Sequence, residues 1–292
     1  MNRQISDRWK LILSMCVFGT IGIVRRYIPY PSSVIALARG LIGMLFLLAL
    51  RLCGGERLAA AELKRNAVSL CLSGVLLGAN WILLFEAYRY TSVSVATVCY
   101  YMAPVFVILT TPIFLHEALT AKKRLCAAAA VCGMVLVSGV LESGVSGLTG
   151  VLFGLGAAVS YAAVILLNKQ ITGLSAGDRT LVQLGAAAVA LLPYVLMTED
   201  LSALDTSWFV LAMLLVAGVV HTGIAYALYF GSIRNLPAQT AALLSYIDPI
   251  TAVVLSALVL KEQLSLTAGV GGALVIGAAA ISELPTGRAE HR

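Results

Sequence analysis

The chain has 292 residues, of which 60% are hydrophobic and only 12% charged, with a formal net charge of +6. So few charged residues cannot cover the surface of a water-soluble protein of this length. The mean hydropathy of +0.94 indicates a polytopic membrane protein. The sequence also lacks a P-loop, a glycine-rich nucleotide fingerprint and an H-E-x-x-H metal motif. Any energy that the protein uses must therefore come from a gradient across the membrane and not from ATP bound by this chain.

Apolar stretches of about 20 residues, the length that crosses a bilayer as a helix, follow one another along the chain. Lipid satisfies no backbone hydrogen bonds and strand alternation is absent, so we expect helices. The predicted fold is an all-α membrane protein with ten transmembrane helices. Their predicted ranges are 10–28, 33–53, 67–88, 92–115, 123–141, 147–168, 179–198, 208–230, 237–260 and 266–282.

The chain repeats itself at a fixed offset of 145 residues. Gly78, Phe85, Arg89, Ala96, Tyr101, Pro104, Glu117 and Leu119 return as Gly223, Phe230, Arg234, Ala241, Tyr246, Pro249, Glu262 and Leu264. The repeat divides the chain into two five-helix halves, residues 1–143 and 144–292. Because five is odd, the second half must enter the membrane in the opposite orientation. Inverted-topology repeats of this kind build many secondary transporters.

Basic residues predict the orientation in the membrane. Fifteen of the 20 Lys and Arg lie on the side of the two termini, four lie on the other side, and Arg39 alone lies within a span. This bias predicts cytoplasmic termini in a bacterial cytoplasmic membrane, with the acidic Glu199–Asp205 loop outside. The basic excess is therefore topological and does not indicate nucleic acid binding.

Processing, redox and metal signals are weak. The first apolar run is followed by Arg25 and Arg26 without a cleavage site, so we expect a retained first span. The six cysteines lie in or beside spans without a C-x-x-C pair. They predict neither a disulfide nor a metal site, and no cofactor is expected.

Residues 87–119 and 232–264 resemble the EamA type of the drug/metabolite transporter superfamily. The resemblance lies in a mid-span proline followed by Glu-x-Leu-Thr/Ser, here Pro104 with Glu117–Thr120 and Pro249 with Glu262–Ser265. It implies ten helices, an inverted pseudo-two-fold and a central cavity lined by helices 1, 3, 4, 6, 8 and 9, with helices 5 and 10 at the periphery. The superfamily handles amino acids, amines, sugars and nucleotide-linked solutes, so the substrate stays open.

The repeated residues also have structural interpretations. Pro104 and Pro249 lie near the middle of spans, where proline opens a helix, and we expect these breaks to line a cavity. The interfacial Glu117 is expected to be structural. The Gly74–Gly78 and Gly150–Gly154 pairs predict close helix packing.

Asp248 is an acidic residue that the repeat does not explain, since its counterpart is Ala103. A charged group in hydrocarbon costs at least about 2.5 kcal/mol unless it is paired or hydrated. Asp248 therefore predicts a proton or substrate site. The alternative is a structural partner for the break at Pro249 or for mid-span His221.

Glu86 is the second such carboxylate, with Gly231 as its counterpart. It lies one turn before the end of its span. It either binds substrate or forms an ion pair with Arg39 or with Arg89, three residues further along.

Aromatic side chains lie within the same spans. Rings around a carboxylate form the usual receptor for an organic cation. The predicted substrate-binding residues are Trp81, Glu86, Tyr101, Tyr161, Tyr246 and Asp248. Supporting positions are Arg39, Asn80, Tyr100, His221 and Tyr226.

These features predict a secondary active transporter that moves a small amine or quaternary ammonium metabolite by alternating access. The alternative is an exporter of amino acids or related zwitterions, in which Arg39 would also matter. A membrane enzyme would need a polar cluster at headgroup depth, which the sequence lacks, and a scaffold or sensor would not need mid-span acids. The expected partners are the solute and the bilayer. A coupling proton, the direction of transport and the choice between monomer and homodimer stay open.

Overall fold

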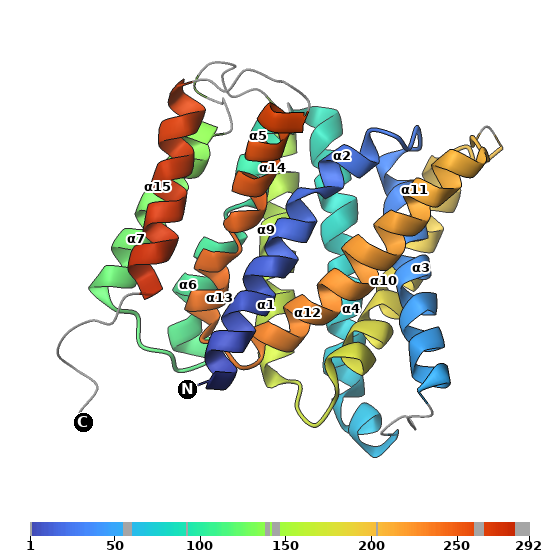
Figure 1. The fold of residues 1–292 in the computed structure, drawn as a ribbon, viewed down its shortest axis with the longest axis horizontal. Helices are drawn as coiled ribbons and strands as arrows, with labels where there is room; N and C mark the ends of the chain where they lie inside the picture. Colours follow the sequence, from blue (N-terminus) through green and yellow to red (C-terminus); the bar gives the residue numbers. More distant parts are fainter. Residues whose placement is uncertain are drawn as a thin grey trace.

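A computed structural model gives the fold and describes residues 2–54, 60–91, 93–137, 141, 147–202, 204–259 and 266–283 (Figure 1). All regular secondary structure in these residues is helical. The elements are α1 (Asn2–Gly19), α2 (Ile21–Arg25), α3 (Ser32–Cys53), α4 (Ala60–Tyr90), α5 (Val93–Tyr100), α6 (Ala103–Phe114), α7 (Ala121–Val137), α9 (Leu148–Gln170), α10 (Ala176–Thr198), α11 (Trp208–Gly218), the π-helix η1 (Val219–Ile224), α12 (Ala225–Ile233), α13 (Ala238–Leu244), α14 (Ile247–Val259) and α15 (Leu266–Glu283).

Membrane-spanning helices are shown for part of the predicted set. Within the described residues, six helical segments are long and apolar enough to cross a bilayer: Ser32–Cys53, Ala60–Tyr90, Val95–Phe114, Leu148–Gln170, Ala176–Thr198 and Trp208–Ile233. The other four predicted spans coincide with α1–α2, α7, α13–α14 and α15, which fall outside those limits of length and composition. The structure therefore shows a helical membrane protein, and the count of ten spans stays a prediction.

Helices at matching positions in the two halves run antiparallel. The end of α3 meets the start of α10 through an ion pair between Arg51 and Asp178. At the opposite ends of the same helices, Ser33 Oγ donates to Glu199 Oε1 at 2.5 Å. Because α3 and α10 are the second spans of their halves, their opposite directions are what an inverted repeat requires.

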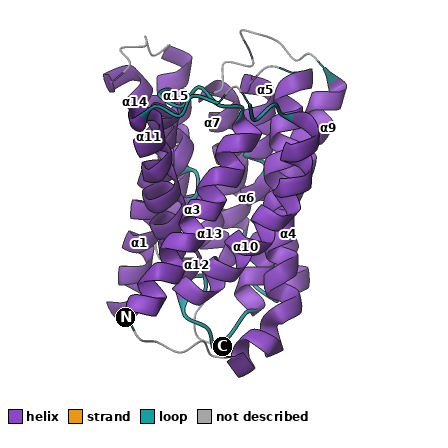
Figure 2. Ribbon diagram, turned by 90° about the vertical axis from the view of Figure 1, so that its right-hand side faces the viewer, coloured by secondary structure: helices purple, strands orange, loops and turns teal. Residues whose placement is uncertain are grey.

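The bundle has two ends, which we name by residues found there. The Asn2 end holds the start of α1 and the end of α15, and the Glu199 end holds the loop between α10 and α11 (Figure 1). Figure 2 shows the helices running side by side between these ends, with the connecting loops gathered at both. The interior of the bundle, between the helices, is therefore the place to look for a binding site.

α7 and α15 form a pair at one edge of the bundle (Figure 1). Gly133 of α7 lies against the Gly271 carbonyl and the side chain of Val275 in α15. These helices correspond to predicted spans 5 and 10, which the family resemblance placed at the periphery.

The paired glycines lie where helices touch. A Cβ on Gly74 would approach the Gln183 carbonyl and the Ala186 Cβ of α10, and one on Gly150 would meet Thr91 after α4. The second glycine of each pair is packed in the same way. Small residues therefore allow the backbones to approach closely, as the spacing predicted.

We expect Gly74→Leu to destabilise the protein by about 1–3 kcal/mol, because the added side chain would overpack the contact between α4 and α10. Gly277→Leu on α15 is the matched control, since no atom of the described residues lies within 4 Å of the position that its Cβ would take. Thermal unfolding of the purified protein measures both. Equal losses of stability would contradict the close contact at Gly74.

Candidate functional site

Two helix pairs are interrupted near the centre of the bundle. The interruptions lie at residues 101–102, between α5 and α6, and at residues 245–246, between α13 and α14. Pro104 is in the first turn of α6 and Pro249 in that of α14. A helix needs no backbone N–H there, so the prolines begin the second helix of each pair. The breaks therefore precede the prolines by about one turn of chain.

A hydrogen bond from Tyr246 connects the two breaks. The Tyr246 hydroxyl donates to the Tyr101 carbonyl at 2.9 Å, and its side chain is fully buried. This bond satisfies a carbonyl at an interruption of the helix, where lipid could not. The geometry therefore places predicted substrate residue Tyr246 in a structural role, outside the cavity lining described next.

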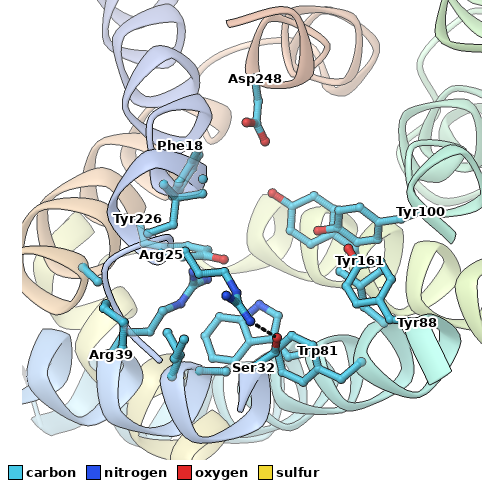
Figure 3. Close-up of a pocket in the computed structure, with 18 residues that line it drawn as sticks. Phe18, Arg25, Ser32, Arg39, Trp81, Tyr88, Tyr100, Tyr161, Tyr226 and Asp248 are labelled. Carbon is cyan, nitrogen blue, oxygen red and sulfur yellow. Dashed lines mark hydrogen bonds between the residues drawn. The ribbon is translucent and has the colours of Figure 1, made fainter. Parts of the chain in front are cut away.

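A cavity of about 270 Å³ lies beside the breaks (Figure 3). The polar and aromatic side chains that line it are Phe18, Arg25, Ser32, Arg39, Trp81, Phe85, Tyr88, Tyr100, Tyr161, Tyr226 and Asp248. An adjoining recess of about 40 Å³ shares Asp248, Tyr100 and Tyr161 and adds Tyr101 and Pro104. Residues from seven of the ten predicted spans therefore contribute to one site.

Opposite charges face this cavity from opposite sides. Figure 3 shows Asp248 entering from α14, with Arg25 and Arg39 across from it. In the described part of the chain, no side chain is hydrogen-bonded or ion-paired to the Asp248 carboxylate. The Arg39 guanidinium carbon lies 4.9 Å from the centre of the Trp81 ring, and Arg25 Nη2 donates to Ser32 Oγ at 3.1 Å. The site thus offers an unpaired acid and a basic wall.

Tyrosines form another wall. The rings of Tyr100 and Tyr161 lie 5.8 Å apart, and those of Trp81 and Tyr226 lie 6.3 Å apart in an edge-to-face arrangement. Such walls accept an apolar or planar group while their hydroxyls supply hydrogen bonds. Of the four aromatic residues predicted to bind substrate, Trp81 and Tyr161 line the cavity and Tyr101 lines the recess. The fourth, Tyr246, is the buried tyrosine at the break.

Glu86 does not line the cavity. It is ion-paired to Arg89 at 3.0 Å, and the Tyr194 hydroxyl donates to it at 2.5 Å. Of the two ion pairs predicted for Glu86, the geometry therefore fits the one with Arg89. Arg39 lines the cavity instead. Glu86 ties α4 to α10 near the Glu199 end.

Asn80 and His221 also lie outside the cavity lining. Asn80 Nδ2 donates to the Ala157 carbonyl at 2.7 Å and joins α4 to α9. His221 is in η1, where its Nε2 and Thr20 Oγ1 share a hydrogen bond of 2.8 Å. Both side chains therefore connect helices.

Glu117 caps a helix of the other half. Its Oε1 accepts from the Ala238 N–H at 2.8 Å, at the start of α13. This contact agrees with the expected structural role. Its repeat counterpart Glu262, with the rest of the Glu262–Ser265 motif, lies outside the described residues.

The sequence interpretation missed Arg25, Tyr88 and Phe18 as cavity residues. The charge pattern places Arg25 after the first apolar run and gives no reason to assign it to a cavity. For Tyr88 a signal existed, because it lies seven residues after Trp81 and therefore on the same helix face. No pattern in the first span singled out Phe18.

Comparison with known proteins decides the family. The EamA-like transporter family matches the chain twice, over residues 9–139 and 148–283. The chain belongs to the EamA-like transporter family. The two matches follow the two halves that the internal repeat indicates, and the family name describes a transporter, not an enzyme.

Relatives of this EamA-like transporter span nearly all of it. It is 31% identical over 251 residues to the uncharacterized transporter YxxF of Bacillus subtilis (strain 168), covering 84% of this chain and 79% of that relative. An uncharacterized transporter of Archaeoglobus fulgidus is 27% identical over 273 residues, covering 93% and 94%. A crystal structure with 18% identity has a TM-score of 0.81 over 96% of this chain and 98% of its own. That likeness supports the fold alone.

We expect Tyr246→Phe to lower the free energy of unfolding by about 1–3 kcal/mol, because it leaves the buried Tyr101 carbonyl without its donor. Tyr27→Phe is the matched control, since the Tyr27 side chain is exposed. Thermal unfolding measures the difference. If both variants are as stable as the wild type, Tyr246 does not hold the break together.

Proposed function

We propose that this EamA-like transporter is a secondary active transporter of a small zwitterionic metabolite, such as an amino acid. The observation that carries the proposal is the placement of Asp248 opposite Arg25 and Arg39 in one cavity. Asp248 would hold an ammonium group and the arginines a carboxylate. Alternating access would expose this site to each side of the membrane in turn.

The Arg39 guanidinium suits a carboxylate. Its Nε is buried and has no hydrogen-bond partner in the described residues. Stacking on Trp81 holds the planar group, so less entropy is lost when it binds a ligand. An unpaired buried donor is costly, and a ligand oxygen would remove that cost.

The cavity size agrees with a small solute. Its volume of about 270 Å³ lies just below the usual range for drug-sized ligands, about 300–1,000 Å³. Tyr100 and Tyr161 would contact the apolar part of the solute. This volume favours a metabolite of amino acid size over a nucleotide-linked one.

A simple organic cation is the second candidate. Asp248 beside Tyr100 and Tyr161 is a suitable arrangement for an amine. However, the two arginines would repel a cation, and Arg39 already covers one face of Trp81. The geometry therefore favours the zwitterion over the amine or quaternary ammonium metabolite predicted from sequence.

The orientation is also part of the proposal. The Asn2 end would be cytoplasmic, because 15 of the 20 basic residues belong to that side. Exposed Arg25 lines the cavity at the Glu199 end, so the cavity opens there. The structure would then represent an outward-facing state.

We expect the wild type to bind a small neutral-side-chain amino acid at least about tenfold more tightly than its methyl ester or its des-amino analogue, a difference of about 1.4 kcal/mol. Arg39→Gln should reduce the discrimination against the ester, because only the Arg25 guanidinium then remains to meet the carboxylate. Asp248→Asn should remove the discrimination against the des-amino analogue. Calorimetry, or ligand-induced stabilisation across a screened set of amino acids, measures each affinity.

Glu86→Gln is the control for these variants, because Glu86 does not line the cavity and both discriminations should persist. Equal wild-type affinities for the amino acid and its ester would discard the zwitterion. A quaternary amine and its uncharged carbon isostere would then test the cation, which should bind at least about tenfold more tightly than the isostere.

We expect a charged, impermeant maleimide to label Leu201→Cys on intact cells and Gly54→Cys only in inside-out vesicles, each in a background without the six native cysteines. Leu201 and Gly54 are exposed at the two ends of the bundle. Labelling of Gly54→Cys from outside would reverse the proposed orientation.

A further inference from the structure

Repeat-related stripes of side chains lie on α4 and α12. The offset of 145 residues pairs Trp81 with Tyr226, Leu84 with Tyr229, Phe85 with Phe230, and Tyr88 with Ile233. Within each helix these positions follow the spacing i, i+3, i+4, i+7, so each set forms one face. The two halves thus present equivalent faces to the interior.

The two faces are in opposite states. All four α4 residues line the central cavity, whereas Tyr226 is the only one of the four on α12 that does. Tyr229, Phe230 and Ile233 are fully buried. The α4 stripe is therefore open toward the Glu199 end, and its counterpart is closed toward the Asn2 end.

α12 separates the central cavity from a second one. The second cavity, of about 340 Å³, lies at the Asn2 end and is lined by Ala227 and Leu228 from the opposite face of α12. Between the two cavities, the Tyr229 ring stacks on Tyr161 with centres 6.3 Å apart and an interplanar angle of 12°. Phe230 packs beside Tyr229 at 5.3 Å. These rings fill the α12 face that corresponds to the cavity-lining face of α4.

Polar contacts hold α12 in this position. Asn235, just after α12, donates from Nδ2 to Asp7 Oδ2 of α1 at 2.8 Å. Arg179 Nη1 of α10 donates to the Phe230 carbonyl at 3.4 Å. Both contacts join α12 to helices on the far side of the second cavity, so movement of α12 would break them.

The segment before α12 can serve as a pivot. η1 is a π-helix, a rare form that is frequent at functional sites. Its Thr222 hydroxyl donates to the Ala217 carbonyl five residues back. Gly43 of α3 packs tightly against the Gly218 carbonyl and the Gly223 nitrogen. η1 is therefore held at one point while α12 extends beyond it.

We propose that α12 is the inner gate and that the second cavity is the cytoplasmic half of the solute's route. This proposal rests on the transport function proposed above. When α12 turns about η1, Tyr229, Phe230 and Ile233 line an inner opening. The equivalent Leu84, Phe85 and Tyr88 then close the outer one. The hydrogen bond between Asn235 and Asp7 is the latch of the closed state.

Leu84→Cys and Ile233→Cys, made singly without the native cysteines, report on the two openings. Both replace an aliphatic residue, and both are labelled with a charged maleimide on purified protein in detergent. We expect Leu84→Cys to react faster than Ile233→Cys. Adding Asn235→Ala should raise the labelling rate of Ile233→Cys and lower that of Leu84→Cys, with the ratio shifting about tenfold, the effect of losing a hydrogen bond to a charged group.

Lys10→Ala is the matched control. Lys10 lines the same cavity and contacts Asp7 at 3.5 Å, but this contact lies within α1 and does not reach α12. It should leave the ratio of rates within about twofold, well below the shift expected for the latch. Asp7→Ala removes the same latch from the other side and should reproduce the effect of Asn235→Ala, which covers the case in which one variant does not fold.

Reciprocal changes at the two reporters are the signature of alternating gates. An increase at both cysteines, or at Ile233→Cys alone, would show local loosening and overturn the proposal, as would unchanged rates in both latch variants. Labelling needs no solute. A failure to bind zwitterions would therefore change the proposed solute and leave this result intact.

Discussion

The absence of hydrogen-bond partners in lipid is the constraint on which this architecture depends. A helix can be interrupted inside the bilayer only where protein satisfies the freed backbone groups. Here the two interruptions lie side by side, and the Tyr246 hydroxyl satisfies the Tyr101 carbonyl. Glu117, at the end of one broken helix pair, caps the start of the other at Ala238. Each half therefore completes the backbone of the other, and a cavity can exist beside the breaks.

The same constraint explains the charges inside the bundle. An ionised side chain in hydrocarbon is tolerated where it is paired or hydrated. Glu86 meets the first condition through Arg89 and Tyr194. Asp248 instead faces the cavity, opposite Arg39. Two carboxylates that look alike in sequence thus differ in what surrounds them, and of the two only Asp248 lines the cavity.

Sequence patterns predicted a helical membrane protein with the two-repeat architecture of its family, because the repeat, the hydropathy and the mid-span prolines are local or periodic signals. They also indicated Asp248, Trp81 and Tyr161, whose types are unusual within spans. The ion pair of Glu86 with Arg89 was among the predicted alternatives. Its contact with Tyr194 could not be predicted, because Tyr194 lies 108 residues further along the chain. Asn80 likewise bonds a carbonyl 77 residues away. Sequence spacing indicates which face of a helix a residue occupies, but not which helix packs there.

The contact between Trp81 and Tyr226 joins two residues that the repeat makes equivalent. Such a contact lies on the pseudo-two-fold axis and maps onto itself when the halves exchange roles. Under the proposed alternating access it would persist in both states, whereas contacts away from the axis would be exchanged for their repeat-related counterparts. Arg39 is stacked on Trp81 and therefore lies close to this contact. A solute held there would stay nearly still while the protein moves around it.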